Sequence, residues 1–349
     1  MTEQQGGAMA GADTGKLAWG ILGTGAIARD FAAAIGASRT GRLIAVASRS
    51  PEAASRFGEA FDVPRRYAPY EALLADPEVG AVYISLPNDL HAEWAIRCAE
   101  AGKHILCEKP LAISQAEASS VIEHARRNDV FLLEGFMYRC HPRTARLKAL
   151  IDTGAIGRLR LIHCTFSFDL GPGTGDIRLS RARGGGGIMD VGCYTTSMAL
   201  LLAGAQPLEV SGVAHIGAES GVDEWATASL RFPDGLLATL TCGIRLELGS
   251  ELTIWGEDGR IEVPDPFFPG KGATSILLRH HGEHEPKEIV TIGENEPFAL
   301  EIDTVVRYLA ERQVPSPGMD WEASLANMAV LDAWHRAIAV RGGTVSSPR

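Results

Sequence analysis

The sequence predicts an α/β protein in which a doubly wound, mostly parallel sheet is followed by an α+β domain with a mostly antiparallel sheet. A glycine-rich turn, Gly20–Ala28, lies between a short apolar run and a helical run near the start of the chain. Strand and helix patterns then alternate up to residue 139, which is typical of parallel βαβ units. Beyond residue 208, strand patterns follow one another without helices between them, which favours antiparallel pairing.

The glycine-rich turn contains the pattern G-x-G-x-x-A, at Gly23, Gly25 and Ala28. Gly23 would make the turn, Gly25 would let the backbone approach a pyrophosphate, and Ala28 would hold the helix against the strand. The free N–H groups and the positive end of the helix dipole would receive the phosphate charge. The pattern therefore predicts a dinucleotide-binding turn made of Gly23, Thr24, Gly25, Ala26 and Ile27.

The elements of the first half follow from local patterns. Pro51 suits a first helical turn, Gly102 a helix end, and Ser114 a helix start. Helices are expected over 29–35, 51–61, 70–75, 91–101 and 114–128, and strands over 17–19, 43–48, 81–86, 103–107 and 130–134. We expect a flexible tail over residues 1–15 and the dinucleotide-binding domain over residues 16–139.

The second half changes character. A strand pattern over 159–168 leads into a glycine-rich segment over 171–187, and a helix is expected over 190–202 before Gly204. Strand patterns with turn signals then occupy 208–291, and amphipathic helices over 298–312 and 321–340 close the chain. We expect an α+β substrate and oligomerisation domain over residues 140–340 and a flexible tail over 341–349.

Composition excludes several classes of protein. The chain has 349 residues, 46% of them hydrophobic and 22% charged, and a formal net charge of −10, which argues against nucleic acid or an anionic membrane as partner. The N-terminal residues lack a basic region followed by an apolar core, which predicts a cytoplasmic protein.

The scattered cysteines predict reduced thiols, and a solvated turn is expected at His280, His281 and His284 rather than a metal site.

The end of the second strand favours NADP over NAD. An NAD-binding unit usually carries an acidic residue about 20 positions past the glycines, which receives the ribose 2′-OH. Here the chain has Ser48, Arg49 and Ser50 instead, and a guanidinium with hydroxyl groups suits a 2′-phosphate. The alternative is an ordinary exposed arginine near a helix start, so NAD remains possible.

Two further segments follow strands, where a doubly wound sheet binds ligands. In the first, Asn88 would bond a cofactor and His91 would line the cleft, or Asn88 would simply make the turn. In the second, Lys109 would polarise a hydroxyl or carbonyl group, although Glu-Lys pairs are also common on surfaces. The cofactor-binding candidates from these segments are Leu86, Pro87, Asn88, His91, Glu108 and Lys109.

Together these motifs, with Gly187-Ile-Met-Asp-Val-Gly-Cys-Tyr194 after the glycine run, make the chain resemble the Gfo/Idh/MocA oxidoreductase family from Leu17 to about Val340. The resemblance implies a Rossmann domain, a second domain on an open, mostly antiparallel sheet, an active site between them, and homo-oligomers such as dimers or tetramers. Lys109 matches the family's catalytic lysine and Asp190 its aspartate, whereas Tyr194 stands where many members carry histidine.

The tyrosine is similar to the branch of glucose–fructose oxidoreductase, dimeric dihydrodiol dehydrogenase and NADP-dependent D-xylose dehydrogenase, in which a tyrosine is the acid/base residue. The stretch from Glu134 to Pro142 also resembles that branch. It implies that Tyr138 and Arg139 line the substrate side, with Arg139 the best candidate contact. Glucose–fructose oxidoreductase is an exported enzyme, whereas no export signal is expected for this chain.

Elementary chemistry agrees with these roles. Asp190 and Tyr194 are four residues apart at a helix start, so we expect their side chains on one face. A phenol with a pKa of about 10 is a poor base at neutral pH, and the Lys109 ammonium is expected to lower that pKa. Tyr194 would then take a hydroxyl proton as hydride leaves the same carbon. The alternatives are an ordinary helix-start acid and a half-buried aromatic residue.

The predicted function is an NADP-dependent oxidoreductase acting on a sugar or cyclic polyol, with Asp190 and Tyr194 contacting the substrate. Oxidation of an aldose of the xylose or glucose type at C1 is the first choice. Reduction of an anhydro- or 3-keto-sugar comes next, and oxidation of a trans-dihydrodiol third. A nucleotide-dependent sensor without catalysis is the alternative from another class, which the set Lys109, Asp190 and Tyr194 argues against.

Overall fold

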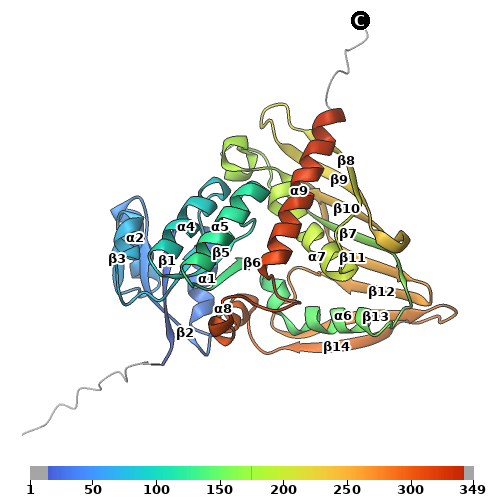
Figure 1. The fold of residues 1–349 in the computed structure, drawn as a ribbon, viewed down its shortest axis with the longest axis horizontal. Coiled ribbons are helices and arrows are strands. Elements are labelled where there is room, and N and C mark those ends of the chain that lie inside the picture. Colours follow the sequence, from blue (N-terminus) through green and yellow to red (C-terminus); the bar gives the residue numbers. More distant parts are fainter. Residues whose placement is uncertain (1–14, 174, 342–349) are drawn as a thin grey trace, which may run out of the picture.

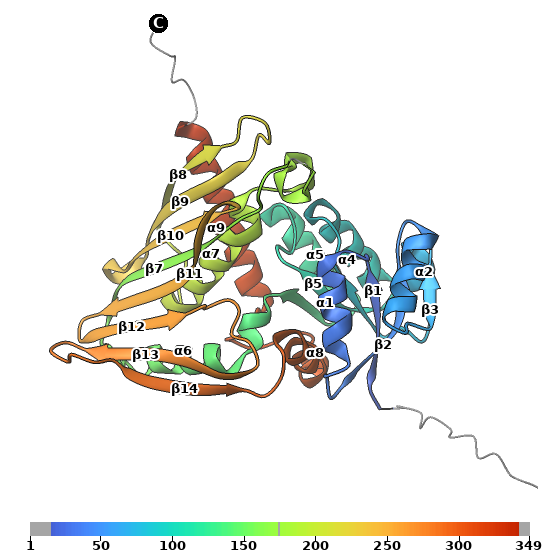
Figure 2. The ribbon, with the colours of Figure 1, turned by 180° about the vertical axis from the view of Figure 1, so that it is seen from behind.

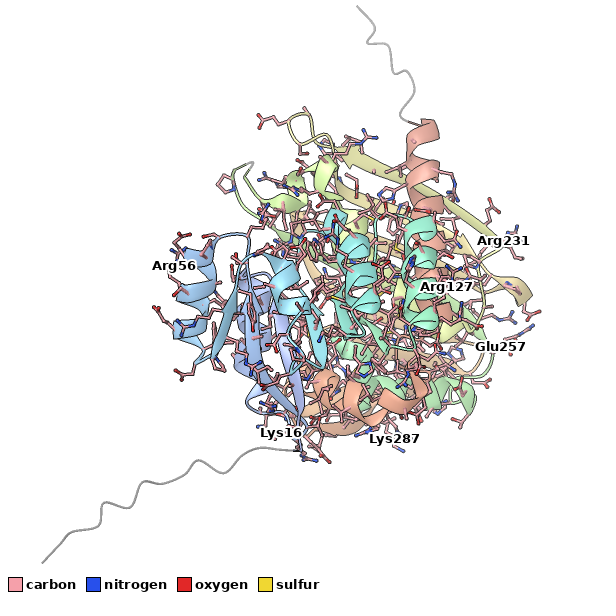
Figure 3. All side chains as sticks on the ribbon, turned by 60° about the vertical axis from the view of Figure 1, so that its left-hand side comes forward. Lys16, Arg56, Arg127, Arg231, Glu257 and Lys287 are labelled. Carbon is pink, nitrogen blue, oxygen red and sulfur yellow. The ribbon has the colours of Figure 1, made fainter. Side chains whose placement is uncertain are left out.

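The computed structural model describes residues 15–173 and 175–341, which form two sheets lying side by side (Figure 1). The predicted tails fall almost entirely on residues 1–14 and 342–349, outside the described residues. Charged side chains such as Arg56, Arg127 and Arg231 project outward from the two halves (Figure 3).

The first sheet is parallel, with the strand order β3-β2-β1-β4-β5-β6. Its strands are β1 Leu17–Leu22, β2 Gly41–Ala47, β3 Arg65–Tyr67, β4 Ala81–Ile84, β5 His104–Glu108 and β6 Leu132–Gly135. The helices between them are α1 Ala26–Ile35, α2 Pro51–Ala60, α3 Tyr70–Leu74, α4 His91–Glu100 and α5 Gln115–Arg127. The order reverses between β1 and β4, which is where such sheets bind ligands.

Apolar burial on both faces holds this sheet together. Trp19, Phe31 and Tyr83 are fully buried, and the Phe31 ring stacks on Tyr83 with 3.9 Å between ring centroids. Continuous apolar runs suit strands covered by helices on both sides, so the predicted parallel, doubly wound sheet is confirmed.

The second sheet has eight strands in the order β14-β13-β12-β11-β7-β10-β9-β8, all antiparallel neighbours except β7 and β10. Helices α6 Pro142–Asp152 and α7 Cys193–Ala203 pack against it (Figure 1). The strands are β7 Leu159–Asp169, β8 Glu209–Ile216, β9 Asp223–Arg231, β10 Leu237–Gly243, β11 Arg245–Gly256, β12 Gly259–Pro264, β13 Gly272–His280 and β14 Lys287–Gly293. The predicted mostly antiparallel sheet is confirmed.

The opposite face of this sheet is partly apolar and exposed; its strands are seen from behind in Figure 2. The strand register places large apolar side chains of β8, β10 and β14 on that face. About half of each side chain is exposed in Val213, Leu237, Val290 and Ile292.

The two closing helices connect the halves. Helix α8, Pro297–Arg307, packs against α1 of the first domain, and Ser38 donates a 2.6 Å hydrogen bond to Asp303. Helix α9, Trp321–Arg341, packs against α7, β8 and α5. Residues near the end of the chain therefore pack against the first domain. The predicted division into 16–139 and 140–340 assigns these residues to the second domain and does not include this contact.

Most predicted elements are present within a few residues of the expected ends. Strand β3 and helix α6 were not predicted, and the helix expected from Asp190 begins instead with a π-helical turn, Ile188–Gly192. One stretch of the described residues, Arg181–Ala203, is long and apolar enough to cross a bilayer, but 83% of its apolar window is buried in the protein, as in a core helix. The six cysteines are free, and the described part of the chain holds no group of three metal-ligating side chains.

Candidate active site

A cavity of about 710 Å³ opens between the two domains, at the carboxyl ends of the parallel strands. The first domain contributes residues from the glycine turn and from the loops after β4 and β5. The second contributes residues from β7, the glycine-rich segment and the start of α7. Its lining includes the predicted residues Ile27, Leu86, Asn88, His91, Glu108, Lys109, Asp190 and Tyr194.

The glycine turn has the geometry that a phosphate-binding turn needs. Gly23 has φ +108°, and a Cβ there would lie 2.8 Å from the Ser85 carbonyl oxygen. Gly25 faces open space instead, so its backbone is accessible. Within the described residues, α1 has no side-chain cap and no acidic residue in its first turn. Free N–H groups at an accessible helix start fit the pyrophosphate of a dinucleotide.

The segment after β2 lies outside the catalytic cavity. Ser48 is buried, whereas Arg49 is exposed at the strand end. Ser50 caps α2 by accepting a hydrogen bond from Ala53 N at 3.2 Å. Burial raises the pKa of the Tyr70 hydroxyl, and the neighbouring Arg49 guanidinium opposes this rise. The exposed Arg49 side chain thus follows directly after β2, and its predicted contact with a 2′-phosphate stays a prediction.

The loop after β4 is tied to both domains. The His91 ring is buried, with its two nitrogens each 2.7 Å from a carbonyl oxygen, those of Leu86 and Pro110. Asn88 donates a hydrogen bond to the Gly184 carbonyl at 2.9 Å, across the domain boundary. His91 thus links the two strand-end loops that flank the cavity, in addition to lining it.

The predicted catalytic residues meet at the cavity wall. Lys109 Nζ lies 2.8 Å from the Asp190 carbonyl oxygen and 3.1 Å from its Oδ1. The same ammonium lies 5.1 Å from the centroid of the Tyr194 ring. Phe166 and Phe136 meet that ring edge to face, at 5.3 and 5.1 Å between centroids. The sequence prediction that these three side chains come together matches this geometry.

Burial and charge compete in this group. Burial is the largest single influence on Lys109 and disfavours the ammonium, but Asp190, Tyr194, Cys193 and Glu108 together outweigh it and raise the pKa of Lys109. Lys109 and Arg178 likewise hold the pKa of Asp190 below its ordinary value despite burial. The expected low pKa of Tyr194 is wrong for the free protein: burial raises the pKa of this phenol, and Lys109 offsets only part of the rise.

Arg139 and Tyr138, the predicted substrate contacts, are not among the residues that line the cavity. The Arg139 guanidinium is buried and donates to the carbonyl groups of Ser197, Pro317 and Gly318. The Tyr138 hydroxyl donates to Ser197 Oγ at 3.0 Å, and burial raises its pKa to about 12. Both side chains therefore connect segments that are distant in sequence. Tyr138 and Arg139 bind Ser197 of α7, and Arg139 also binds the carbonyl groups of Pro317 and Gly318.

Several residues that line the cavity were not predicted from the sequence. Arg178 donates from Nε to Asp190 Oδ2 at 2.9 Å, although no local pattern distinguishes it from the other arginines of the glycine-rich segment. Phe166, Phe168 and Phe268 line the second domain's side of the cavity. Alternation in β7 is the only signal for two of them, and it does not show which strand face meets the cavity.

The comparisons with known proteins cover both halves. Residues 17–136 match the oxidoreductase family with an NAD-binding Rossmann fold, and residues 144–262 match the Gfo/Idh/MocA C-terminal domain. The D-xylose 1-dehydrogenase (NADP(+)) 2 of Haloferax volcanii is 34% identical over 316 residues, 90% of this chain and 95% of that protein. The mouse trans-1,2-dihydrobenzene-1,2-diol dehydrogenase is 33% identical over 260 residues, 72% of this chain and 76% of that protein.

Solved structures with the same fold include two enzymes. One is a 3-ketoreductase from Actinomadura kijaniata in complex with NADP and TDP-benzene, with 29% identity, a TM-score of 0.85, and coverage of 93% of this chain and 98% of that one. The other is the aldose-aldose oxidoreductase from Caulobacter crescentus complexed with glycerol, with 26% identity, a TM-score of 0.84, and coverage of 94% and 98%. The chain belongs to the Gfo/Idh/MocA oxidoreductase family.

Proposed function

We propose that this oxidoreductase transfers hydride between NADP and a ring carbon of a sugar or cyclic polyol, and that its main reaction is the oxidation of an aldose of the xylose or glucose type at C1. The observation that carries the proposal is the contact between Lys109, Asp190 and Tyr194 at the wall of a cavity that begins at a dinucleotide-binding turn. Proton-transfer groups beside a nicotinamide site suit the oxidation of a CH–OH group.

Tyr194, Lys109 and Asp190 have separate roles in this reaction. Bound NADP supplies the hydride acceptor. Tyr194 takes the hydroxyl proton of the substrate, and the Lys109 ammonium stabilises the phenolate that this step needs. Asp190 holds Lys109 through its carboxylate and its backbone carbonyl, which fixes the ammonium against the ring. Substrate binding excludes water from this group, which strengthens these charge interactions.

The preference for NADP rests on Arg49. Its exposed guanidinium follows β2, where a carboxylate would favour NAD, and the similar D-xylose 1-dehydrogenase is named for NADP. A guanidinium binds a 2′-phosphate through charge-assisted hydrogen bonds.

Other substrates are compatible with the same site. The relatives include a 3-ketoreductase and a trans-dihydrodiol dehydrogenase. Reduction of a keto-sugar needs the same groups in the opposite direction, with Tyr194 donating the proton. The apolar part of the lining, Phe166, Phe168 and Phe268, favours a ring with one apolar face, which pyranoses and cyclic dihydrodiols both present.

Two further properties belong to this proposal. The half-exposed apolar side chains on the open face of the second sheet, Val213, Leu237, Val290 and Ile292, support a homo-oligomer that covers this face. A cytoplasmic location stays a prediction from the sequence.

The test is a fluorescence titration with NADPH and with NADH, followed by a panel of aldoses, keto-sugars and a trans-dihydrodiol. Tighter NADPH binding and NADP-dependent oxidation of an aldose would support the proposal. Binding of NADPH without turnover on the whole panel would favour the sensor function. Preferential NADH binding would contradict the cofactor assignment and move the substrate toward inositols and glycosides.

A further inference from the structure

The Asp190 carboxylate lies between two cations that come from different parts of the chain. Its Oδ1 lies 3.1 Å from Lys109 Nζ, at the end of β5, and its Oδ2 lies 2.9 Å from Arg178 Nε, in the glycine-rich segment. The Asp190 side chain is only 13% exposed, so neither ion pair is fully screened by water. One carboxylate therefore neutralises at most one of the two cations.

The glycine run brings Arg178 to this position. Gly186 N donates to the Arg178 carbonyl at 2.8 Å, and Asp190 N donates to the Gly186 carbonyl at 3.0 Å. A Cβ at Gly185 would lie 2.3 Å from the Arg178 carbonyl oxygen, and Gly186 has φ +113°. Glycines at 185 and 186 allow the segment to fold back this closely, and the dinucleotide site does not explain them.

The guanidinium is also held from its other sides. Asp176 accepts from Arg178 Nη1 at 3.2 Å, and Asp176 Oδ1 accepts from the backbone N of Arg178 at 2.8 Å. The guanidinium carbon lies 5.9 Å from the centroid of the Phe168 ring. The Asp176 side chain is 35% exposed, and its charge is therefore screened more strongly than that of Asp190.

The charge balance at the phenol follows from this arrangement. Without Arg178, the Asp190 carboxylate would cancel the Lys109 ammonium, and the buried phenol of Tyr194 would face a neutral pair. With Arg178, the carboxylate is shared between two cations, so it offsets less of the Lys109 charge that acts on the phenol. The other ionisable groups that act on Lys109 lie on β5, β6, α4 and α7: Glu108, Glu134, His91, Cys193 and Tyr194.

We propose that Arg178 is a positioning residue that engages the Asp190 carboxylate, so that the charge of Lys109 acts on Tyr194 during proton transfer. The proposal rests on the proposed function in assigning the proton transfer to Tyr194. The shared carboxylate can be tested separately, in a measurement that uses no substrate.

The first experiment measures the reactivity of Lys109 by competitive acetylation of the full-length protein, followed by mass spectrometry. In Arg178→Gln, Asp190 would hold the ammonium alone, and Lys109 acetylation at a fixed pH would slow about tenfold, the equivalent of one pKa unit. Arg178→Lys would stay within about threefold of the wild type. Arg181→Gln, which changes an exposed arginine in the same segment, is the matched control and would leave the rate unchanged.

Faster acetylation in Arg178→Gln would mean that Arg178 only limits the access of the reagent to Lys109. This result would overturn the proposal. An unchanged rate would overturn it too. Melting temperatures of the three variants within a few degrees of the wild type would show that the folded states are comparable.

The second experiment records the pH dependence of kcat for the oxidation identified by the substrate panel. The limb that reports loss of activity at low pH would move up by about one pH unit in Arg178→Gln, because the phenolate loses a stabilising charge, and Arg178→Lys would restore it. A raised KM with an unmoved limb would assign Arg178 to substrate binding instead. Absence of turnover in the wild type would overturn the proposed function, whereas the acetylation result would still decide whether Arg178 engages Asp190.

Discussion

The Lys109 ammonium donates to both the carboxylate and the backbone carbonyl of Asp190, at 3.1 and 2.8 Å, across 81 residues of sequence. Lys109 follows β5 of the parallel sheet, and Asp190 lies in the π-helical turn before α7 of the second domain. The ion pair therefore joins the two domains at the cavity. Any movement between the domains would change the distance between Lys109 and Asp190, and with it the position of Lys109 against Tyr194.

Replacing Tyr194 by phenylalanine is expected to remove the proton-transfer group while keeping the apolar ring packing. We expect kcat to fall by about 10²- to 10⁴-fold, with an unchanged dissociation constant for NADPH. Tyr138→Phe is the matched control, because it loses the hydrogen bond to Ser197 and about 1 kcal/mol of stability but lies behind the site. Equal loss of kcat in the two variants would contradict the assignment of Tyr194.

Adding a methyl group at the two glycines of the turn is expected to separate folding from cofactor binding. At Gly23 the Cβ would lie 2.8 Å from the Ser85 carbonyl oxygen at a positive φ, so Gly23→Ala should destabilise the protein by about 1–3 kcal/mol. At Gly25 the Cβ would enter open space, so Gly25→Ala should keep its stability in urea and lose affinity for NADPH. Full NADPH affinity in Gly25→Ala would place the pyrophosphate elsewhere.

Arg49→Ala tests the cofactor preference. The loss of charge-assisted hydrogen bonds to a 2′-phosphate should weaken NADPH binding by about ten- to a hundredfold and leave NADH binding unchanged. Arg56→Ala is the control, because Arg56 projects outward from the neighbouring α2 (Figure 3). The measurement is a fluorescence titration of both variants with both nucleotides. Equal loss of affinity for NADPH and for NADH in Arg49→Ala would show that Arg49 does not recognise the 2′-phosphate.

Glu134 is expected to make stability depend on pH. Burial raises its pKa to about 7, and its Oε1 accepts from Leu111 N at 2.8 Å. The folded protein then holds a proton that the unfolded chain, with a pKa of about 4.3, releases, so the free energy of unfolding falls as the pH rises between these values. From pH 5 to pH 8 this contribution amounts to about 2–3 kcal/mol.

Glu134→Gln keeps a carbonyl acceptor for Leu111 and cannot ionise. In urea denaturation, the difference in stability between the wild type and this variant should therefore change with pH by that amount, while other groups cancel in the comparison. A constant difference between pH 5 and pH 8 would show that Glu134 is ionised throughout.

Local patterns were enough to predict the fold class. The glycine turn and the alternation of buried strands with capped helices specify the first sheet, and closely spaced turn signals specify the second. The short strand β3, Arg65–Tyr67, was missed because it has charged side chains and depends on pairing with β2. The return of α8 to α1 was missed because it depends on contacts such as that of Ser38 with Asp303, far apart in sequence.

The site was predictable where a motif fixes the backbone. Lys109, Asp190 and Tyr194 were predicted through the family resemblance that the motifs carry, and the structure brings them together. The direction of a long side chain is not fixed in this way: Arg139 turns inward to carbonyl groups, whereas Arg178 reaches Asp190 through a fold of the glycine run. The raised pKa of Tyr194 depends on burial, which a sequence pattern does not quantify.

The most direct test of the account is Lys109→Ala, compared with the wild type in an NADPH titration and in turnover of the best substrate from the panel. Removing the ammonium takes away the charge beside Tyr194 but leaves the dinucleotide turn intact. We expect turnover to fall by at least about 100-fold, with the dissociation constant for NADPH within about threefold of the wild type. Turnover that survives in Lys109→Ala would contradict the account, because the proton transfer would then not depend on the contact of Lys109 with Asp190 and Tyr194.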